Sequence, residues 1–129
     1  MPGEKPEITE VVNAQMPLGE TLGIRMFAGA DEVDATLEWA PELCTAGGVL
    51  HGGVLMSLAD AAGGVCAFLN LPPGATTVTI ESKTNFLGAV RAGTVTARSR
   101  PLHVGKTTIV VETDVLDAGQ KEKFSAMKG

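Results

Sequence analysis

The sequence GGVLHGGVLMSLADAAGG, residues 47–64, lies in the most apolar part of the chain and contains most of its one long predicted helix. From Gly52 to about Leu69 the residues favour a helix, and NLPPG, residues 70–74, ends it with two prolines and a glycine. Apolar residues occupy nearly every side of this helix instead of one stripe. A helix of this kind is normally enclosed by protein, so we expect it to form the centre of the core.

A single carboxylate, Asp60, interrupts this apolar helix, and residues 26–82 contain no Lys or Arg that would neutralise it. An apolar setting raises the pKa of a carboxyl group and strengthens it as a base. The alternative is a structural Asp60 that hydrogen-bonds to Ser, Thr or backbone groups, or one that faces solvent. We favour a functional carboxylate, because a buried unpaired charge is costly to retain.

Gly52 and Gly53 stand where the helix begins, with no side chain to obstruct the unpaired backbone N–H groups of its first turn. Such amides suit a carbonyl oxygen or an oxyanion, although close packing of the loop also explains a glycine pair. His51 and Asp60 are nine positions apart, which is about 13 Å along a helix and roughly half a turn out of phase. The helix start and the carboxylate therefore cannot meet at one substrate atom within one subunit. Two antiparallel helices packed across a two-fold axis would bring them together.

Other candidate residues near this segment lack the partners that their chemistry needs. His51 fits a role in capping or orienting the loop, but no second His lies near it, and His103 belongs to a predicted strand. The ligand set of a metal site is therefore missing, and we expect no metal. Ser57 is not assigned as a nucleophile, because neither an elbow motif nor an ordered triad partner accompanies it.

The composition indicates a globular protein with an aliphatic core, since 44% of the 129 residues are hydrophobic, 19% are charged and 4% are aromatic. This length suits one domain, residues 1–129. A net charge of −5 argues against general nucleic-acid binding. Residues 1–82 hold two basic against eleven acidic residues, whereas residues 83–129 hold eight against four. The C-terminal cations are either solvated strand faces or a patch for an anionic ligand.

The two cysteines, Cys44 and Cys66, form neither a CxxC pair nor a disulfide framework, and the first residues lack the pattern of a secretory signal. We therefore expect a cytoplasmic protein. Asp60 and clustered glycines interrupt the only apolar run of sufficient length, so we also expect no membrane span and no membrane partner.

The rest of the chain predicts a short helix followed mainly by strands. Residues 6–16 carry apolar positions at helical spacing, and we expect this helix to end near Pro17 and Gly19. Residues 41–50 form a predicted loop. Alternation and β-branched residues predict antiparallel strands at 23–28, 33–39, 76–86, 93–104, 106–117 and, with a weaker pattern, 121–128. This order indicates an α+β fold, in which an antiparallel sheet wraps around one long helix.

Residues 48–60, GVLHGGVLMSLAD, resemble the G-x-x-H-G-G-x-x-x-x-L-A-D signature of hotdog-fold acyl-CoA thioesterases of the phenylacetate-degradation, or PaaI-like, type. NFLGAVRAG, residues 85–93, and HVGKTTIVVETDV, residues 103–115, are similar to two strands of the same family. The resemblance thus covers roughly residues 20–117. The hotdog fold is an antiparallel β-sheet wrapped around one long central helix, which is the arrangement expected above.

The resemblance implies hydrolysis of an acyl-CoA substrate by a homo-oligomer, a dimer or a dimer of dimers, with no metal or redox cofactor. In the family pattern the Gly52 N–H would bind the thioester oxygen. Asp60 of the partner subunit would activate water or attack the carbonyl carbon. Thr79 falls near a position where related enzymes place a hydroxyl that helps to position water. Candidates for contacts with the CoA phosphates are Arg91, Arg100, Lys106 and Thr107.

Two features depart from the family pattern. Thr45 stands six residues before His51, where the family commonly has an Asn or Gln that supports the site. A hydroxyl reaches less far than an amide, so slower catalysis or a different loop would follow. The final segment, KEKFSAMKG, is also more charged than the apolar last strand of the relatives.

The sequence leaves other functions open beside thioester hydrolysis. Thr45 also fits a noncatalytic acyl-CoA-binding or regulatory module on the same fold. A hotdog dehydratase would carry Asp and His close together in a hydratase motif, and no such motif is found. For a hydrolase, we expect pocket walls that suit an aryl or medium-chain acyl group, formed by Val54, Leu55, Leu58 and Phe68.

Overall fold

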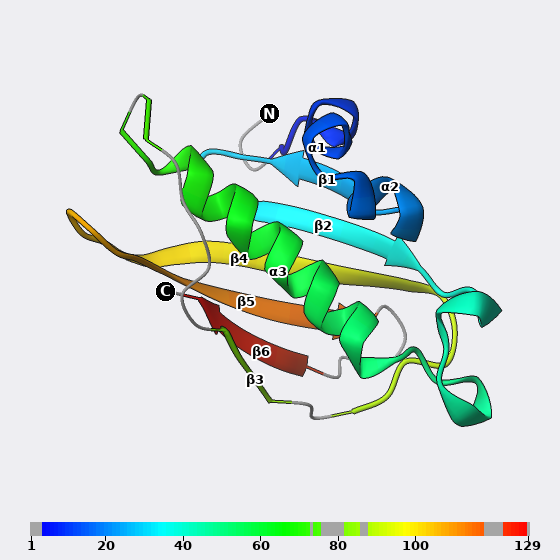
Figure 1. The fold of residues 1–129 in the computed structure, drawn as a ribbon. Helices are drawn as coiled ribbons and strands as arrows, with labels where there is room; N and C mark the ends of the chain where they lie inside the picture. Colours follow the sequence, from blue (N-terminus) through cyan, green and yellow to red (C-terminus); the bar gives the residue numbers. More distant parts are fainter. Residues whose placement is uncertain (1–3, 73, 76–81, 86–87, 118–122, 129) are drawn as a thin grey trace.

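A computed structural model describes residues 4–72, 74–75, 82–85, 88–117 and 123–128. Within them, six antiparallel strands form one sheet in the order β1-β2-β4-β5-β6-β3. One long helix, α3 (Gly52–Leu69), crosses one face of this sheet (Figure 1). The predicted α+β class and the boundaries of the central helix are therefore confirmed. The strands are β1 (Arg25–Ala28), β2 (Val33–Glu38), β3 (Ser82–Asn85), β4 (Thr94–Val104), β5 (Ile109–Asp117) and β6 (Lys123–Lys128).

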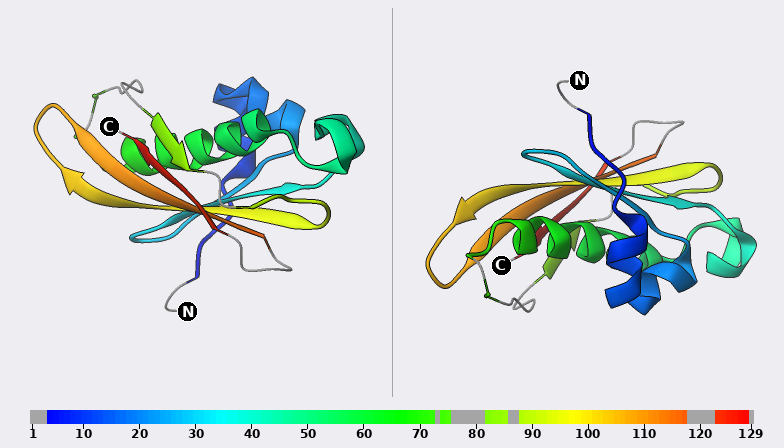
Figure 2. Two further views of the ribbon diagram at one scale, coloured as in Figure 1. Left: turned by 90° about the horizontal axis from the view of Figure 1, so that it is seen from below. Right: turned by 90° about the horizontal axis from the view of Figure 1, so that it is seen from above.

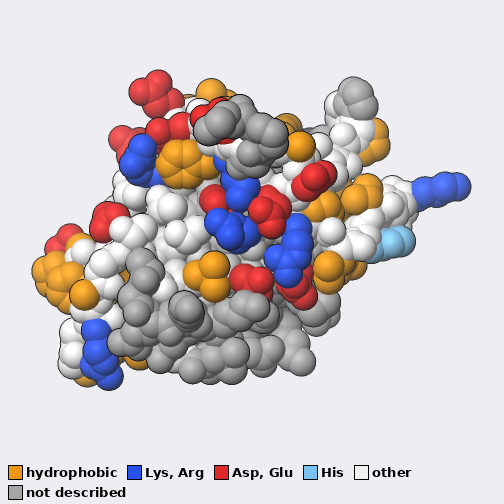
Figure 3. All heavy atoms as spheres, turned by 180° about the vertical axis from the view of Figure 1, so that it is seen from behind, with side chains coloured by type: hydrophobic (Ala, Val, Ile, Leu, Met, Phe, Trp, Pro, Cys, Tyr) orange, Lys and Arg blue, Asp and Glu red, His pale blue; other side chains and the backbone are white. Residues whose placement is uncertain are grey.

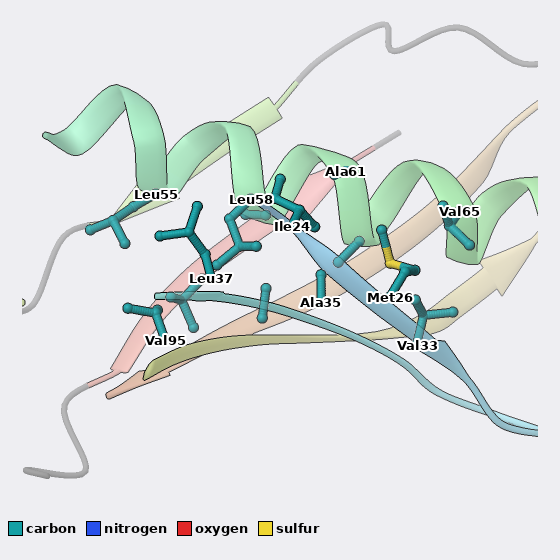
Figure 4. Close-up of a cluster of buried hydrophobic side chains, with 14 of the residues drawn as sticks. Ile24, Met26, Val33, Ala35, Leu37, Leu55, Leu58, Ala61, Val65 and Val95 are labelled. Atoms are coloured by element: carbon teal, nitrogen blue, oxygen red, sulfur yellow. The ribbon is translucent and has the colours of Figure 1, made fainter. Parts of the chain in front are cut away.

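The core lies between α3 and the middle of the sheet, where α3 contacts β2, β4 and β5. Alternate residues of the strands face the helix, as the period of two in their burial shows. Figure 4 shows Leu55, Leu58 and Ala61 of α3 packed toward these strand residues. The strand residues that are buried at this layer are Val33, Ala35, Leu37, Val95, Ala97, Val111 and Val115.

One side of α3 is left uncovered by the sheet, and half of the helix is buried. Met56, Asp60 and Phe68 are exposed, and Gly64 between them is half-buried. These residues recur every four positions, so they share one stripe of the helix surface. The expectation of a helix enclosed on every side is therefore wrong for the single protomer, because the sheet covers only one face. By length and a mean hydropathy of 1.6, α3 would also pass as a membrane span, but the core helix of a globular fold passes the same test.

The N-terminal region forms two helices, α1 (Thr9–Gln15) and α2 (Pro17–Leu22), where the sequence predicted one. Pro17 begins α2 instead of ending α1, because proline is well suited to the first position of a helix. α2 ends at Leu22 and is capped by Gly23, whose φ of 73° lies in the left-handed region, so β1 begins two residues later than predicted, at Arg25. Both helices lie on the same side of the sheet as α3 (Figure 2).

The two edges of the sheet differ. The N-terminal segment runs along β1, where the Ile8 N–H donates to Met26 O at 2.8 Å and the Ala28 N–H donates to Pro6 O at 3.0 Å. At the other edge, β3 pairs with β6 and, among the residues described, with no further strand. The backbone of β3 therefore presents hydrogen-bonding groups to whatever lies beside it.

Candidate active site

The first turn of α3 is held by the residue that precedes it. His51 is the N-cap residue, and its Nδ1 atom accepts a hydrogen bond of 2.8 Å from the Gly53 N–H. The Val54 N–H donates to His51 O at 2.9 Å. Within the described part of the chain, the Gly52 N–H makes no hydrogen bond, so it remains available at the positive end of the helix dipole. The predicted capping role of His51 is confirmed, and the amide of Gly52 suits a developing oxyanion.

Backbone hydrogen bonds to other segments fix the loop before α3 in place. The Leu50 N–H donates to Val90 O and the His51 N–H donates to Leu43 O, both at 2.9 Å. Two short 3-10 helices, η1 (Pro41–Leu43) and η2 (Ala46–Gly48), lie within the predicted loop, and Gly47 and Gly48 adopt φ values of 77° and 74°. These contacts fix the direction from which the chain enters α3.

Thr45 belongs to this loop and is exposed. Its backbone N–H donates to Val49 O at 2.8 Å, while its hydroxyl makes no hydrogen bond to the described residues. The Trp39 indole N–H donates to Gly48 O at 2.9 Å on the same loop. Thr45 therefore stays a candidate that presents a hydroxyl near the helix start, and its loop is held by other residues.

Asp60 lies on the uncovered stripe of α3, eight residues after Gly52, which is about 12 Å along the helix. Its side chain is exposed in the single protomer, so the expectation of a buried carboxylate is wrong at this level of assembly. The sequence pattern placed apolar residues on all sides of the helix, but this side faces away from the sheet. The separation from Gly52 confirms that one protomer does not bring the amide and the carboxylate to one substrate atom.

A hollow of about 290 Å³ opens beside Asp60, between α2 and α3, and we call it the Asp60 hollow. Its walls are mostly apolar, and they come from the chain around α2 as well as from one face of α3. The lining residues are Met16, Leu18, Gly19, Leu22, Ile24, Met56, Ser57, Asp60 and Ala61.

The predicted pocket walls do not line this hollow. Leu55 and Leu58 are 3% and 0% exposed and fill the core under α3, whereas Phe68 is 57% exposed near the far end of the helix. The sequence gives no clear sign that α2 contributes to the hollow, because Pro17 suits the end of one helix as well as the start of the next. The sequence did contain one signal for the lining of this hollow: Met56 lies four residues before Asp60 and therefore on the same helix face.

Of the four predicted phosphate-binding residues, only Arg91 is placed near the start of α3. Arg91 is exposed and follows Val90, whose carbonyl oxygen accepts from the Leu50 N–H next to His51. Lys106 and Thr107 are exposed at the hairpin that joins β4 to β5. The 11-residue strand β4 separates that hairpin from Arg91 by roughly 33 Å, so one protomer does not bring these residues together.

Arg100 alternates with the buried residues of β4 and therefore lies on the face of the sheet opposite α3. Basic and acidic side chains gather side by side on this face (Figure 3). Arg100 forms ion pairs with Glu112 and, at 3.4 Å, with Asp114. The expectation that Arg100 contacts CoA is therefore not supported by its position, because β4 and β5 place acidic partners beside it. Thr79 lies outside the described residues, so its predicted role stays a prediction.

Asp34 anchors the same outer face. Burial acts to raise the pKa of Asp34, but hydrogen bonds from Arg98, at 2.9 and 3.0 Å, and from Lys5, at 3.1 Å, outweigh it and hold the pKa below its usual value. These charges neutralise one another within the chain. On the opposite side of the sheet, α3 brings the carboxylate of Asp60 to the apolar walls of the Asp60 hollow. Among the residues described, no group of three or more His, Cys, Asp and Glu side chains is arranged to hold a metal ion.

Comparison with known proteins agrees with this geometry. Residues 47–124 match the thioesterase superfamily. A 1,4-dihydroxy-2-naphthoyl-CoA hydrolase from Listeria monocytogenes is 33% identical over 107 residues, which cover 82% of this chain and 87% of that protein. A solved thioesterase from Haemophilus influenzae superposes with a TM-score of 0.86 at 31% identity, covering 99% of this chain and 92% of that chain.

Two further solved structures share the fold. A mutant thioesterase from Pseudomonas aeruginosa has a TM-score of 0.86 at 29% identity and covers 94% of this chain and 90% of that one. A protein related to phenylacetic acid degradation, from Ralstonia eutropha JMP134, has a TM-score of 0.78 at 21% identity, with 87% and 86% of the two chains covered. The protein is thus a thioester hydrolase in class, with the hotdog fold, and it belongs to the thioesterase superfamily.

Proposed function

We propose that the protein hydrolyses acyl-CoA thioesters to a free acid and CoA, with an aryl or medium-chain acyl group as the substrate class. The observation that carries this proposal is Asp60, a carboxylate at the mouth of a mostly apolar hollow on the uncovered side of α3. The similarity to a hydrolase of 1,4-dihydroxy-2-naphthoyl-CoA supports CoA thioesters, and aryl ones among them, as substrates.

The chemistry needs one acid and one oxyanion site. The Gly52 N–H would donate to the carbonyl oxygen of the thioester and stabilise the negative charge that develops there. As a general base, Asp60 takes a proton from water while the water oxygen bonds to the carbonyl carbon; the C–S bond then breaks, and the proton passes to the CoA thiolate. As a nucleophile, Asp60 attacks the carbonyl carbon, and the C–S bond breaks to release the CoA thiolate and leave an acyl anhydride. Water hydrolyses this anhydride in a second step, which restores the Asp60 carboxylate and supplies the proton that the thiolate takes up. Both routes consume one water and yield one acid and one thiol.

Two copies of the chain are needed to join these groups, since about 12 Å of helix separates Gly52 from Asp60 in one protomer. The uncovered stripe of α3 and the available edge of β3 are the surfaces that a second copy would cover. In such a dimer the Gly52 N–H of one protomer would face Asp60 of the partner subunit. Each dimer would hold two equivalent sites, and a dimer of dimers would hold four.

The CoA portion would approach the start of α3, where Arg91 is exposed beside the loop. Its guanidinium would pair with a phosphate, as arginine does in most phosphate sites. Lys106 and Thr107 would serve the same CoA only as residues of another protomer. A cytoplasmic location fits a substrate of this kind and the two free cysteines.

The test compares the wild type with Asp60→Asn for loss of thioester absorbance, across aromatic and aliphatic acyl-CoAs. Asn keeps the shape of the side chain and removes the base. We expect hydrolysis by the wild type and, in the variant, binding without turnover. Following the absorbance of the thioester makes a thiol reagent unnecessary, and such a reagent would also react with the free Cys44.

A noncatalytic acyl-CoA-binding module remains the second candidate, because the hydroxyl of Thr45 makes no hydrogen bond to the described residues. Tight acyl-CoA binding by a wild type that releases no CoA would favour that module over the hydrolase.

A further inference from the structure

The single tryptophan of the chain, Trp39, directly follows β2, at the end of the sheet where α3 begins (Figure 1). We propose that Trp39 is a positioning residue for thioester hydrolysis. Its indole N–H braces the turn at residues 44–50, so that the hydroxyl of Thr45 is held beside the start of α3. The inference rests on the proposed function and adds a residue outside the loop on which the rate depends.

The turn at residues 44–50 closes on itself just before α3. Cys44 pairs with Leu50 in an antiparallel bridge, and the Thr45 N–H donates to Val49 O at 2.8 Å. These contacts place Thr45 beside the segment that leads into the helix. Thr45 is exposed, and its hydroxyl makes no hydrogen bond to the described residues, so the hydroxyl can donate to a substrate at the helix start.

The tip of this turn depends on hydrogen bonds, because its glycines have no packing to hold them. Gly47 and Gly48 have φ values of 77° and 74°, which lie in the left-handed region. A Cβ atom added to either glycine would have no neighbouring atom within 4 Å, so the tip faces open space. Consecutive glycines are also the most freely rotating backbone when nothing restrains them. The bond of 2.9 Å from the Trp39 indole N–H to Gly48 O ties this tip to the end of β2.

Trp39 is itself fixed on the side of the sheet. Its backbone N–H donates to Gly93 O at 2.8 Å, and its half-buried ring packs against the core. The base of the turn is held separately, since the Leu50 N–H donates to Val90 O at 2.9 Å. Loss of the indole N–H therefore releases the tip of the turn and leaves the entry of the chain into α3 bonded.

This arrangement predicts an effect on the rate of hydrolysis more than on substrate affinity. The hydroxyl of Thr45 is attached directly to Cβ, so it moves with the backbone of the turn. A displacement of about 1 Å takes a donor out of good hydrogen-bonding geometry, and such misplacements slow catalysis when the donor orients the reacting group. Arg91, the candidate for the CoA phosphates, lies outside the turn and is not held by the indole.

The test removes the indole N–H and keeps the shape of the ring. Because Trp39 is the only tryptophan, growth of a tryptophan auxotroph on benzothienylalanine replaces it alone and puts sulfur where the N–H was. Fluorotryptophan, which keeps the N–H, is the matched control. Trp39→Phe is a genetically encoded variant that also lacks the donor. Thr45→Val, which removes the hydroxyl, is combined with each form.

Steady-state hydrolysis of octanoyl-CoA and benzoyl-CoA gives kcat and KM for every form. With benzothienylalanine or Trp39→Phe, kcat should fall about tenfold and KM should stay within about twofold of the unmodified protein. Fluorotryptophan should leave kcat unchanged. Thr45→Val should lower kcat by a similar factor, and loss of the indole N–H should then lower it by less than about twofold more, because both changes act on one hydroxyl.

The outcomes separate this inference from the proposed function. Hydrolysis whose kcat does not depend on the indole N–H, even if the unfolding temperature falls, would make the bond merely structural and overturn the inference, while the thioesterase activity stands. Equal losses with benzothienylalanine and fluorotryptophan would overturn the hydrogen bond as the cause. Losses that multiply in the Thr45→Val background would overturn Thr45 as the group that Trp39 positions. An unmodified protein that hydrolyses no acyl-CoA would overturn the proposed function itself, and this inference with it.

Discussion

The two sides of α3 differ in burial, because one packs against the sheet and the other borders an open hollow. On the inward side, residues such as Leu58 and Ala62 are fully buried against the strands and stabilise the fold. On the outward side, Met56 and Asp60 border an open hollow and contribute little to the core. One helix therefore combines a packing surface with the surface that carries the proposed catalytic carboxylate, and substitutions on its two sides should separate stability from activity.

The largest expected effect is on the outward side. Asp60→Asn should lower kcat/KM for acyl-CoA hydrolysis by roughly 10²–10⁴-fold, because it removes the group that, in the proposed mechanism, activates water or attacks the carbonyl. Its thermal unfolding should change little, since the side chain is exposed in the protomer. Asp31→Asn, which removes an exposed carboxylate in the turn between β1 and β2, serves as the charge control and should keep full activity. Unchanged turnover by Asp60→Asn would contradict the assignment.

The matching change on the inward side is Leu58→Ala. Leu58 is 0% exposed, and its loss leaves a cavity under α3, so the free energy of unfolding should fall by about 2–5 kcal/mol. Met56→Ala, at a residue that is 42% exposed, should cost about 0.5 kcal/mol or less. Urea unfolding measures both. Equal losses would mean that contact with a second copy buries the outward side as deeply as the sheet buries the inward side, and the contrast in stability between the two sides would not hold.

This contrast also marks what the sequence was able to predict. The ends of α3 followed from the glycine pair at its start, next to the candidate cap His51, and from the NLPPG sequence after it, because capping residues and prolines act locally. The sequence did not predict that Asp60 lies on the uncovered side of α3. The helix is apolar on all sides, and only the position of the sheet decides which side is covered. For the same reason the sequence predicts Leu55 and Leu58 as pocket walls, whereas the structure buries both in the core.

Contacts between distant segments account for the remaining differences. Arg100 lies opposite Glu112 through the register of β4 and β5, which a single sequence does not reveal, so a cation expected to bind phosphate is found in ion pairs. The Asp60 hollow needs α2 to lie over the middle of α3, a contact between residues about 40 positions apart. Local patterns singled out candidate site residues, and tertiary packing decided which of them lie near one another.

A smaller effect on stability is expected at the N-terminal end of α3. His51→Ala removes the side chain that accepts from the Gly53 N–H and should lower the free energy of unfolding by about 0.5–2 kcal/mol. His51→Asn provides the matched control, because Asn is a favourable N-cap residue and should retain most of this stability. Thermal unfolding of the two variants measures the difference. If both lose stability equally, the hydrogen bond to Gly53 is not what stabilises the first turn.

The smallest effect is expected on the outer face of the sheet, where Asp34 is paired with Arg98 and Lys5. The pKa of Asp34 is held below its ordinary value of 3.8, so the carboxylate stabilises the fold fully above pH 3.8 and loses this contribution as the pH falls through the lowered pKa. Asp34→Asn should therefore cost about 1 kcal/mol or less at neutral pH, and the difference from the wild type should shrink in acid. Urea midpoints at neutral pH and below pH 3.8 measure this change, with Asp31→Asn as the control. A difference that grows as the pH falls would contradict the pairing, because protonation removes the charge that Arg98 and Lys5 stabilise.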